Sequence, residues 1–169
     1  IKVEPAIDAT DYAKTSQGLE DEFTVLDWQP TLTDGAEKVT ALSLSGVEDG
    51  YQIRLRAGGV ESQLSVLDGK LTLTAAQLDS LLNGGQLLVK APEDSDRDTN
   101  IQSHVTVTQH DVDSGAVAEK VIDGNLHVDI QAVVEPDGVL TQTGGALVGQ
   151  GGADIDLAGR FLFTDLDPS

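Results

Sequence analysis

Short runs of β-forming residues alternate with Asp-Gly and Asn-Gly pairs along almost the whole chain of 169 residues. Such pairs favour tight turns, because Gly, Asn and Asp accept the positive φ angles that hairpin turns require. Many short strands joined by tight turns are typical of antiparallel β-sandwiches. The turn pairs are Asp34-Gly35, Asp49-Gly50, Asp68-Gly69, Asn83-Gly84, Asp123-Gly124 and Asp137-Gly138.

The alternation of apolar and polar residues places the strands between these turns. We expect an all-β fold, an antiparallel sandwich of the immunoglobulin or cadherin type, in which Asp68-Gly69 closes a two-residue hairpin. Ser103 interrupts the apolar face of one of the longest expected strands. The expected strands are residues 22–26, 39–44, 51–55, 64–67, 70–73, 86–90, 101–108, 125–134 and 160–163.

One segment has the period of a helix instead. Thr74 can cap a helix over residues 75–82, and Asn83-Gly84 can end it. Leu78, Leu81 and Leu82 would then share one face, because residues three and four apart are neighbours on a helix. We expect this short helix to close one end of the sandwich.

A near-repeat suggests how the chain is divided into modules. Val3-Glu4-Pro5 returns as Val134-Glu135-Pro136, and each is followed by small residues and then by an acidic strand. Repetition of this kind is typical of tandem arrays, so we expect a longer parent protein. The expected division is an N-terminal linker or first strand at 1–19, a sandwich module at 20–136, and a linker with the opening strands of a second unit at 137–169. The last segment could instead supply extra strands to a split sandwich.

The net charge of −19 limits the possible partners, because only 10 basic residues accompany 29 acidic ones. Nucleic acid and anionic membrane surfaces are therefore not expected partners. No apolar run approaches the roughly 18 residues that a membrane span needs. We expect a monomer whose charge is balanced in part by bound cations.

Clustered acidic side chains suggest where such cations would bind. Asp94, Asp96 and Asp98 stand at alternate positions, as at the start of an EF-hand loop. Thr99 replaces the glycine and Val105 replaces the last glutamate of that motif, so a complete EF-hand is not expected. A calcium site in a loop between strands and a solvated acidic loop both stay open.

Two further acidic groups lie beside expected strands. Asp111 and Asp113 form an Asp-x-Asp loop, and Asp34 lies close to Glu37. Calcium takes six to eight oxygen ligands, which carboxylates from two or three loops can supply together. We therefore predict Ca²⁺ as the cofactor, with ligands among Asp34, Glu37, Asp94, Asp96, Asp98, Asp111 and Asp113.

The sequence contains few residues or motifs that could support catalysis. Cysteine is absent, and His104, His110 and His127 lack a metal-ligand spacing. No Gly-x-Ser-x-Gly elbow or phosphate loop occurs. Trp28 is expected to pack in the sandwich core and not to present a sugar-stacking surface. We do not expect an enzyme.

With these motifs assembled, the chain resembles the long tandem repeats of giant bacterial RTX adhesins, which leave the cell by type I secretion. The resemblance covers roughly residues 20–136, and the opening strand returns within 153–169. Ala36 departs from the pattern, because a serine would be usual there. The matching segments are residues 20–26, 33–44, 69–78, 87–94, 105–115, 126–130 and 134–136.

This resemblance implies a secreted, calcium-stabilised extender at the bacterial cell surface that supports adhesion and biofilm formation. Its partners would be neighbouring modules, and in such adhesins a ligand-binding domain can be inserted into a split module. The alternative is a module that itself binds sugar or peptide, for which no binding residues are assigned. A carbohydrate-active enzyme is the least favoured interpretation.

Overall fold

The computed structural model describes residues 5–133, 139–142 and 161–164. The chain divides into two compact units, Ile1–Gln131 and Ala132–Ser169. The described part of the first unit holds two sheets and one helix, and is called the sandwich unit below. The described part of the second holds an antiparallel pair of strands, β10 (Val139–Gln142) and β11 (Phe161–Thr164).

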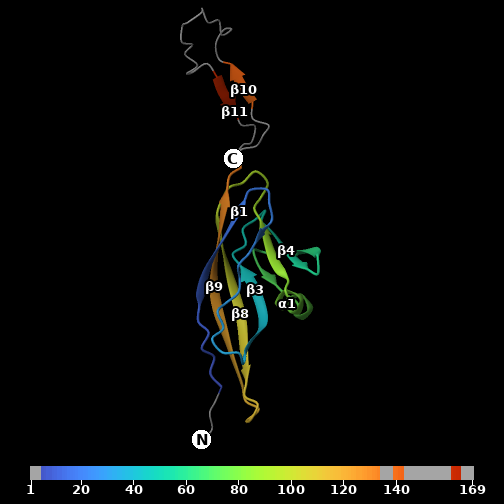
Figure 1. The fold of residues 1–169 in the computed structure, drawn as a ribbon, viewed down its shortest axis with the longest axis vertical. Coiled ribbons are helices and arrows are strands. Elements are labelled where there is room, and N and C mark those ends of the chain that lie inside the picture. The colour runs from blue at the N-terminus through green and yellow to red at the C-terminus, as the bar shows by residue number, and fades with distance from the viewer. Residues whose placement is uncertain (1–4, 134–138, 143–160, 165–169) are drawn as a thin grey trace, which may run out of the picture. The chain divides into compact units, whose positions relative to one another are not determined.

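The larger sheet of the sandwich unit has five strands in the order β1-β9-β8-β3-β6. All neighbours are antiparallel except β1 and β9, which run in parallel side by side (Figure 1). The strands are β1 (Tyr12–Leu19), β3 (Glu37–Ser45), β6 (Leu71–Thr72), β8 (Thr99–His110) and β9 (Val117–Gln131).

The smaller sheet has four antiparallel strands in the order β2-β7-β4-β5. These strands are β2 (Thr24–Val25), β4 (Gln52–Ala57), β5 (Val60–Leu64) and β7 (Gln86–Lys90). The chain therefore passes from the larger sheet to the smaller one directly after β1. Gly18 lies at this crossing, where an added Cβ would meet Thr24 Oγ1 at 1.7 Å.

One hydrophobic core is shared by both sheets. Alternate residues of β8 are buried, among them Ile101 and Val105, whereas β7 is buried continuously from Leu87 to Val89. Both strands lie inside their sheets, and β7 contributes apolar side chains at every one of these positions. The prediction of an all-β fold with two mostly antiparallel sheets is confirmed.

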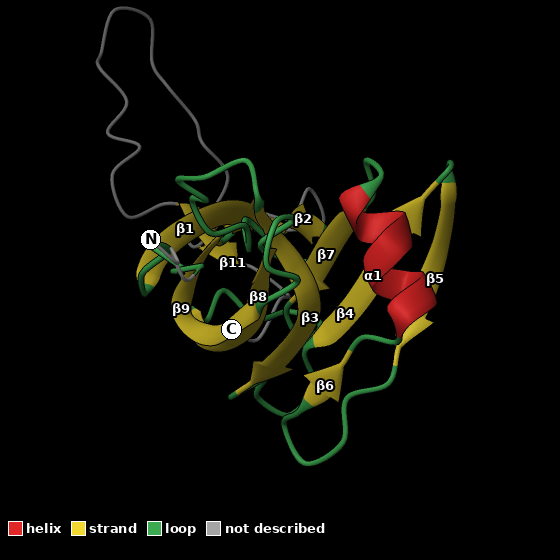
Figure 2. Ribbon diagram, turned by 90° about the horizontal axis from the view of Figure 1, so that it is seen from below, coloured by secondary structure: helices red, strands yellow, loops and turns green. Residues whose placement is uncertain are grey.

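The helix and its cap are as predicted. The helix α1 spans Ala75–Leu82, and Thr74 and Gln77 form a reciprocal capping box at its start. It lies beside β4 and β5 (Figure 2), packs on β3 and β4, and buries Leu78 and Leu81 in the common core. Burial of this apolar face, more than propensity, stabilises a helix of only eight residues.

The predicted hairpin at Asp68-Gly69 is also confirmed. Leu67 and Lys70 form an antiparallel bridge, and each backbone N–H donates to the carbonyl oxygen of the other. Asp68 has φ +51° and Gly69 has φ +69°, as the tightest hairpin turns require.

One predicted turn and one predicted strand are wrong. Asp123-Gly124 is not a turn, because β9 runs straight through it from Val117 to Gln131. A Cβ on Gly124 would lie 2.3 Å from Ser103 Oγ and 2.4 Å from Cζ of Tyr12. Glycine at this position therefore leaves room for a close packing contact, and serves no turn.

The other error concerns the edge of the smaller sheet. The predicted strand at 64–67 is replaced by β5, which ends at Leu64. Gly58 and Gly59, both at positive φ, form the turn that joins β4 to β5. The sequence analysis did not include this Gly-Gly pair, and so it placed the strand too late. The expected turn at Asp137-Gly138 lies outside the described residues.

The close packing around Gly124 predicts that adding one methyl group at this position lowers the stability of the protein. Gly124→Ala is expected to lower the free energy of unfolding by about 1–3 kcal/mol, because the new Cβ overlaps Ser103 and Tyr12. Urea denaturation measures the change. Gly35→Ala is the control, because a Cβ there meets nothing within 4 Å and its φ is not positive. Equal unfolding midpoints for the two variants would contradict the packing argument.

Candidate functional site

The path of the chain gives the sandwich unit two ends, one where the chain enters it and one where the chain leaves it. At the entry end, residues 5–11 lie beside the start of β3 and the start of β9, where Lys120 Nζ donates to the carbonyl oxygen of Ala9 at 2.7 Å. At the exit end, β9 finishes at Gln131, whose carbonyl oxygen accepts from the Glu20 N–H at 3.0 Å. The 15 residues of β9 separate these ends by roughly 50 Å.

Glu37 joins the N-terminal segment to the sheet at the entry end. Its side chain is 4% exposed, and its Oε1 accepts from the backbone N–H groups of Asp8 and Ala9 at 2.7 and 3.3 Å. Its Oε2 accepts from Thr33 N–H at 3.3 Å. This predicted metal ligand therefore binds backbone donors from two segments.

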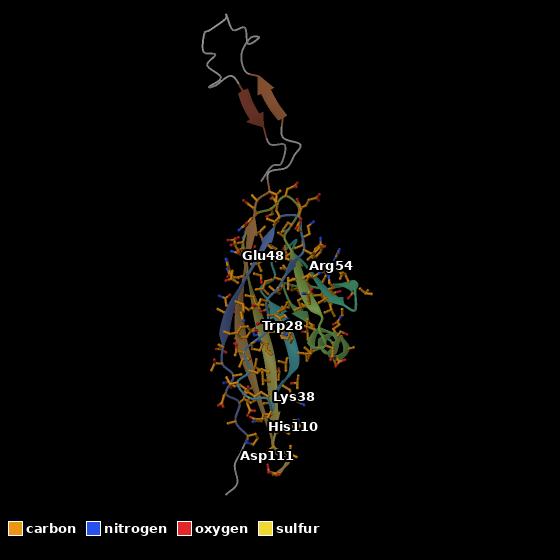
Figure 3. All side chains as sticks on the ribbon, in the orientation of Figure 1. Trp28, Lys38, Glu48, Arg54, His110 and Asp111 are labelled. Carbon is orange, nitrogen blue, oxygen red and sulfur yellow. The ribbon has the colours of Figure 1, made fainter. Side chains whose placement is uncertain are left out.

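Of the other three predicted ligands at the entry end, Asp34 and Asp111 accept local hydrogen bonds, and Asp113 donates its backbone N–H to Asp111. Figure 3 places Asp111 at this end, away from Glu48. Its Oδ1 accepts from the N–H groups of Asp113 and Ser114, and its Oδ2 from the Ser114 hydroxyl. Asp34 Oδ1 accepts from Ala36 N–H, and its Oδ2 from the Gln109 amide.

The contacts of Asp111 also change the pKa of its carboxyl group. The Ser114 hydroxyl, followed by the N–H groups of Asp113 and Ser114, lowers the pKa of the Asp111 carboxyl. A depressed carboxyl pKa stabilises the folded state above the unfolded pKa, and this stabilisation is lost as the pH falls through the folded pKa. The carboxylate thus orders the turn between β8 and β9 at neutral pH.

The remaining predicted ligands lie at the exit end, in the loop before β8. Asp98 Oδ1 accepts from Ile130 N–H at 2.9 Å, so it holds the loop against β9. Asp94 has φ +57°, and its N–H donates to Asp21 Oδ1 at 3.3 Å. Over the described part of the chain, the carboxylates of Asp94 and Asp96 have no hydrogen bond or ion pair.

The seven predicted ligands are therefore divided between two ends. Among residues 5–133, 139–142 and 161–164, no three His, Asp or Glu side chains converge as a metal cluster. At the entry end, backbone and side-chain donors occupy the carboxylate oxygens of Asp34, Glu37 and Asp111, so these three side chains fit a calcium ion less well. At the exit end the carboxylates of Asp94 and Asp96 accept no hydrogen bond within the described residues, so these two side chains fit a cation better.

A contact that was not predicted positions the first strand. The Tyr12 hydroxyl lies 2.8 Å from Ser103 Oγ and donates to the carbonyl oxygen of Trp28. Burial raises the pKa of Tyr12, so its hydroxyl keeps its proton at neutral pH. The signal in the sequence was Ser103, a polar residue on an otherwise apolar strand face, but its partner could not be identified from spacing.

The two aromatic residues best suited to ligand stacking are inside the fold. Trp28 is 4% exposed and Tyr51 is 7% exposed, and both belong to the hydrophobic core. The Tyr51 hydroxyl donates to the carbonyl oxygen of Arg97 and so braces the loop before β8. Trp28 is therefore a core residue, as predicted, and neither ring offers a surface on which a sugar could stack.

Within the described residues, no helix has both the length and the apolar character needed to cross a membrane. None of the protein-family models, curated proteins and solved structures that were compared with the chain matches it.

The buried carboxylate of Glu37 predicts a clear loss of stability on neutralisation. Glu37→Gln is expected to lower the free energy of unfolding by about 1–3 kcal/mol, because a glutamine has one acceptor oxygen for three backbone donors. Urea denaturation gives the value. Glu119→Gln, at an exposed position of β9, is the control and should change little. Similar losses in both variants would show that net charge, and not the Glu37 contacts, is responsible.

Proposed function

We propose that the chain is a structural spacer module of a secreted bacterial cell-surface adhesin of the RTX type. The observation that carries the proposal is the placement of the chain ends of the sandwich unit at its entry and exit ends. A module built in this way adds its full length to a tandem array. Its role would be to hold a ligand-binding part of the same protein away from the cell and so support adhesion and biofilm formation.

The pairing of β1 with β9 suits a spacer under tension. All eight residues of β1 pair with β9 in parallel. In a tandem array, force would be applied at the start of β1 and at the end of β9. Because the two strands are parallel, this force pulls them in opposite directions along their length. The hydrogen bonds between the strands are then loaded together in shear, and separation requires all of them to break at once.

An immunoglobulin-like or cadherin-like topology is part of this proposal. Two mostly antiparallel sheets around one core support it, as does a first strand placed beside the last. The buried Trp28 and Tyr51 favour a spacer over a sugar-binding module, because neither ring reaches the surface. The expected partners are neighbouring modules of the same protein.

Calcium is proposed as the stiffening ion, at the exit end. Asp94 and Asp96 would be its side-chain ligands, because their carboxylates accept no hydrogen bond within the described residues. Extracellular calcium modules have Kd values of about 10⁻⁴–10⁻³ M, so such a site would fill outside the cell and stay empty in the cytosol. At ten times Kd the bound ion would add about 1.4 kcal/mol to the stability.

Calcium is expected to raise the melting temperature of the full chain. A gain of about 1.4 kcal/mol corresponds to a rise of roughly 3–6 °C at millimolar calcium. Differential scanning calorimetry with CaCl₂, against MgCl₂ and NaCl at equal ionic strength, separates binding from charge screening. A variant with both Asp94→Asn and Asp96→Asn is expected to lose the rise.

The matched control neutralises two aspartates at the entry end, Asp111→Asn and Asp113→Asn. This variant removes the same charge and should keep the calcium response, even if its starting stability is lower. If sodium and calcium act alike, the calcium site is wrong. If both double variants lose the response, the assignment to the exit end is wrong.

The direction of pulling is expected to decide the mechanical strength. With handles before β1 and after β9, force spectroscopy on the full chain should give an unfolding force several-fold higher than with handles at Asp11 and Ser114. The second pair lies at the entry end, where β1 peels from β9 one residue pair at a time. Equal forces for the two directions would remove the mechanical argument for a spacer.

A further inference from the structure

The outer face of the larger sheet carries a serine, a histidine and an aspartate in one hydrogen-bonded row. Ser45 Oγ lies 2.9 Å from His104 Nε2, and His104 Nδ1 lies 2.6 Å from Asp123 Oδ1. The residues come from β3, β8 and β9, which are adjacent strands. His104 is directly opposite Asp123, and Ser45 is one diagonal step away on the other side.

One tautomer of His104 satisfies both contacts. With the proton on Nδ1, that N–H donates to the Asp123 carboxylate, and the Nε2 lone pair accepts from the Ser45 hydroxyl. This is the order of roles in which a carboxylate orients an imidazole and the imidazole activates a nucleophile. The row is accessible, because the side chains of His104 and Asp123 are 40% and 58% exposed.

A positive charge completes the surroundings of Ser45. Lys70 and Thr72 line the same surface hollow as Ser45 and His104, and Lys70 follows directly on the hairpin that precedes β6. Ser45 thus has an imidazole base and an ammonium group in one hollow. The ammonium can stabilise the negative charge that develops on a carbonyl oxygen under attack.

We propose that Ser45 is an activated nucleophile and that this face hydrolyses small carboxylic esters, an activity separate from the spacer role. Ser45 Oγ attacks the ester carbonyl carbon, and its proton passes to His104 Nε2. His104 returns that proton to the departing alkoxide as the C–O bond breaks, which leaves an acyl group on Ser45. Water then attacks the acyl group by the same proton path and releases the acid.

The catalytic residues are Ser45, His104 and Lys70, and Asp123 is a positioning residue that acts through His104. In the sequence, His104 was notable only for lacking a metal-ligand spacing. Its partners lie in other strands, and no Gly-x-Ser-x-Gly elbow marks Ser45. Only the register of three strands brings them together.

The test is release of p-nitrophenolate from p-nitrophenyl acetate by the full chain, with mass spectrometry of the acylated peptide. Acetate on Ser45 and repeated turnover are expected. Ser45→Ala should abolish the activity, and His104→Gln should lower it by roughly 100-fold or more, since a general base contributes about 10²–10⁴-fold. Ser80→Ala, on α1, is the control for an ordinary serine.

Two further variants separate chemistry from structure. Asp123→Asn should lower the rate while Asp123→Glu restores much of it, and all variants should keep the wild-type circular dichroism spectrum. Lys70→Met should lower turnover, whereas Lys38→Met on β3 should not. The proposal is overturned if release is absent, if it is equal in Ser45→Ala, or if an acyl burst occurs without turnover.

Discussion

The arrangement of the sandwich depends on the seating of β1 against β9, and this seating depends on a polar contact at the edge of the core. Tyr12 reaches both Ser103 and the carbonyl oxygen of Trp28, and Gly124 provides the space for its ring. The contact connects the start of β1 to two strands and to the segment that leads away from β2. Satisfying these buried polar groups stabilises one strand order over others.

The parallel pairing of β1 and β9 has consequences at both ends of the sandwich unit. It places the entering chain next to Glu37 and the departing chain next to the loop that carries Asp94 and Asp96. The acidic residues at the two ends therefore differ in their hydrogen-bond contacts. At the entry end Glu37 and Asp111 accept hydrogen bonds that hold the N-terminal segment and the turn between β8 and β9, whereas the carboxylates of Asp94 and Asp96 at the exit end accept none within the described residues.

Local structure could be predicted best from the sequence. The helix over residues 75–82 and the hairpin at Asp68-Gly69 each depend on a few consecutive residues, so cap and turn chemistry sufficed to predict them. The analysis failed at Gly124, because the same glycine serves a turn or a close contact depending on what faces it. For Glu37, which was predicted as a metal ligand, spacing alone could not show that its oxygens accept from backbone donors at Asp8, Ala9 and Thr33.

By itself, the sequence determined that the chain is built from short strands, has one capped helix and carries a large negative charge. These properties follow from alternation, turn residues and composition, all of which act over a few positions. Which side chains meet could not be read from the sequence, because contacts such as Tyr12 with Ser103, or Ser45 with His104 and Asp123, depend on strand order and register. Residues remote in sequence become neighbours here because the register of adjacent strands in the larger sheet sets them opposite each other.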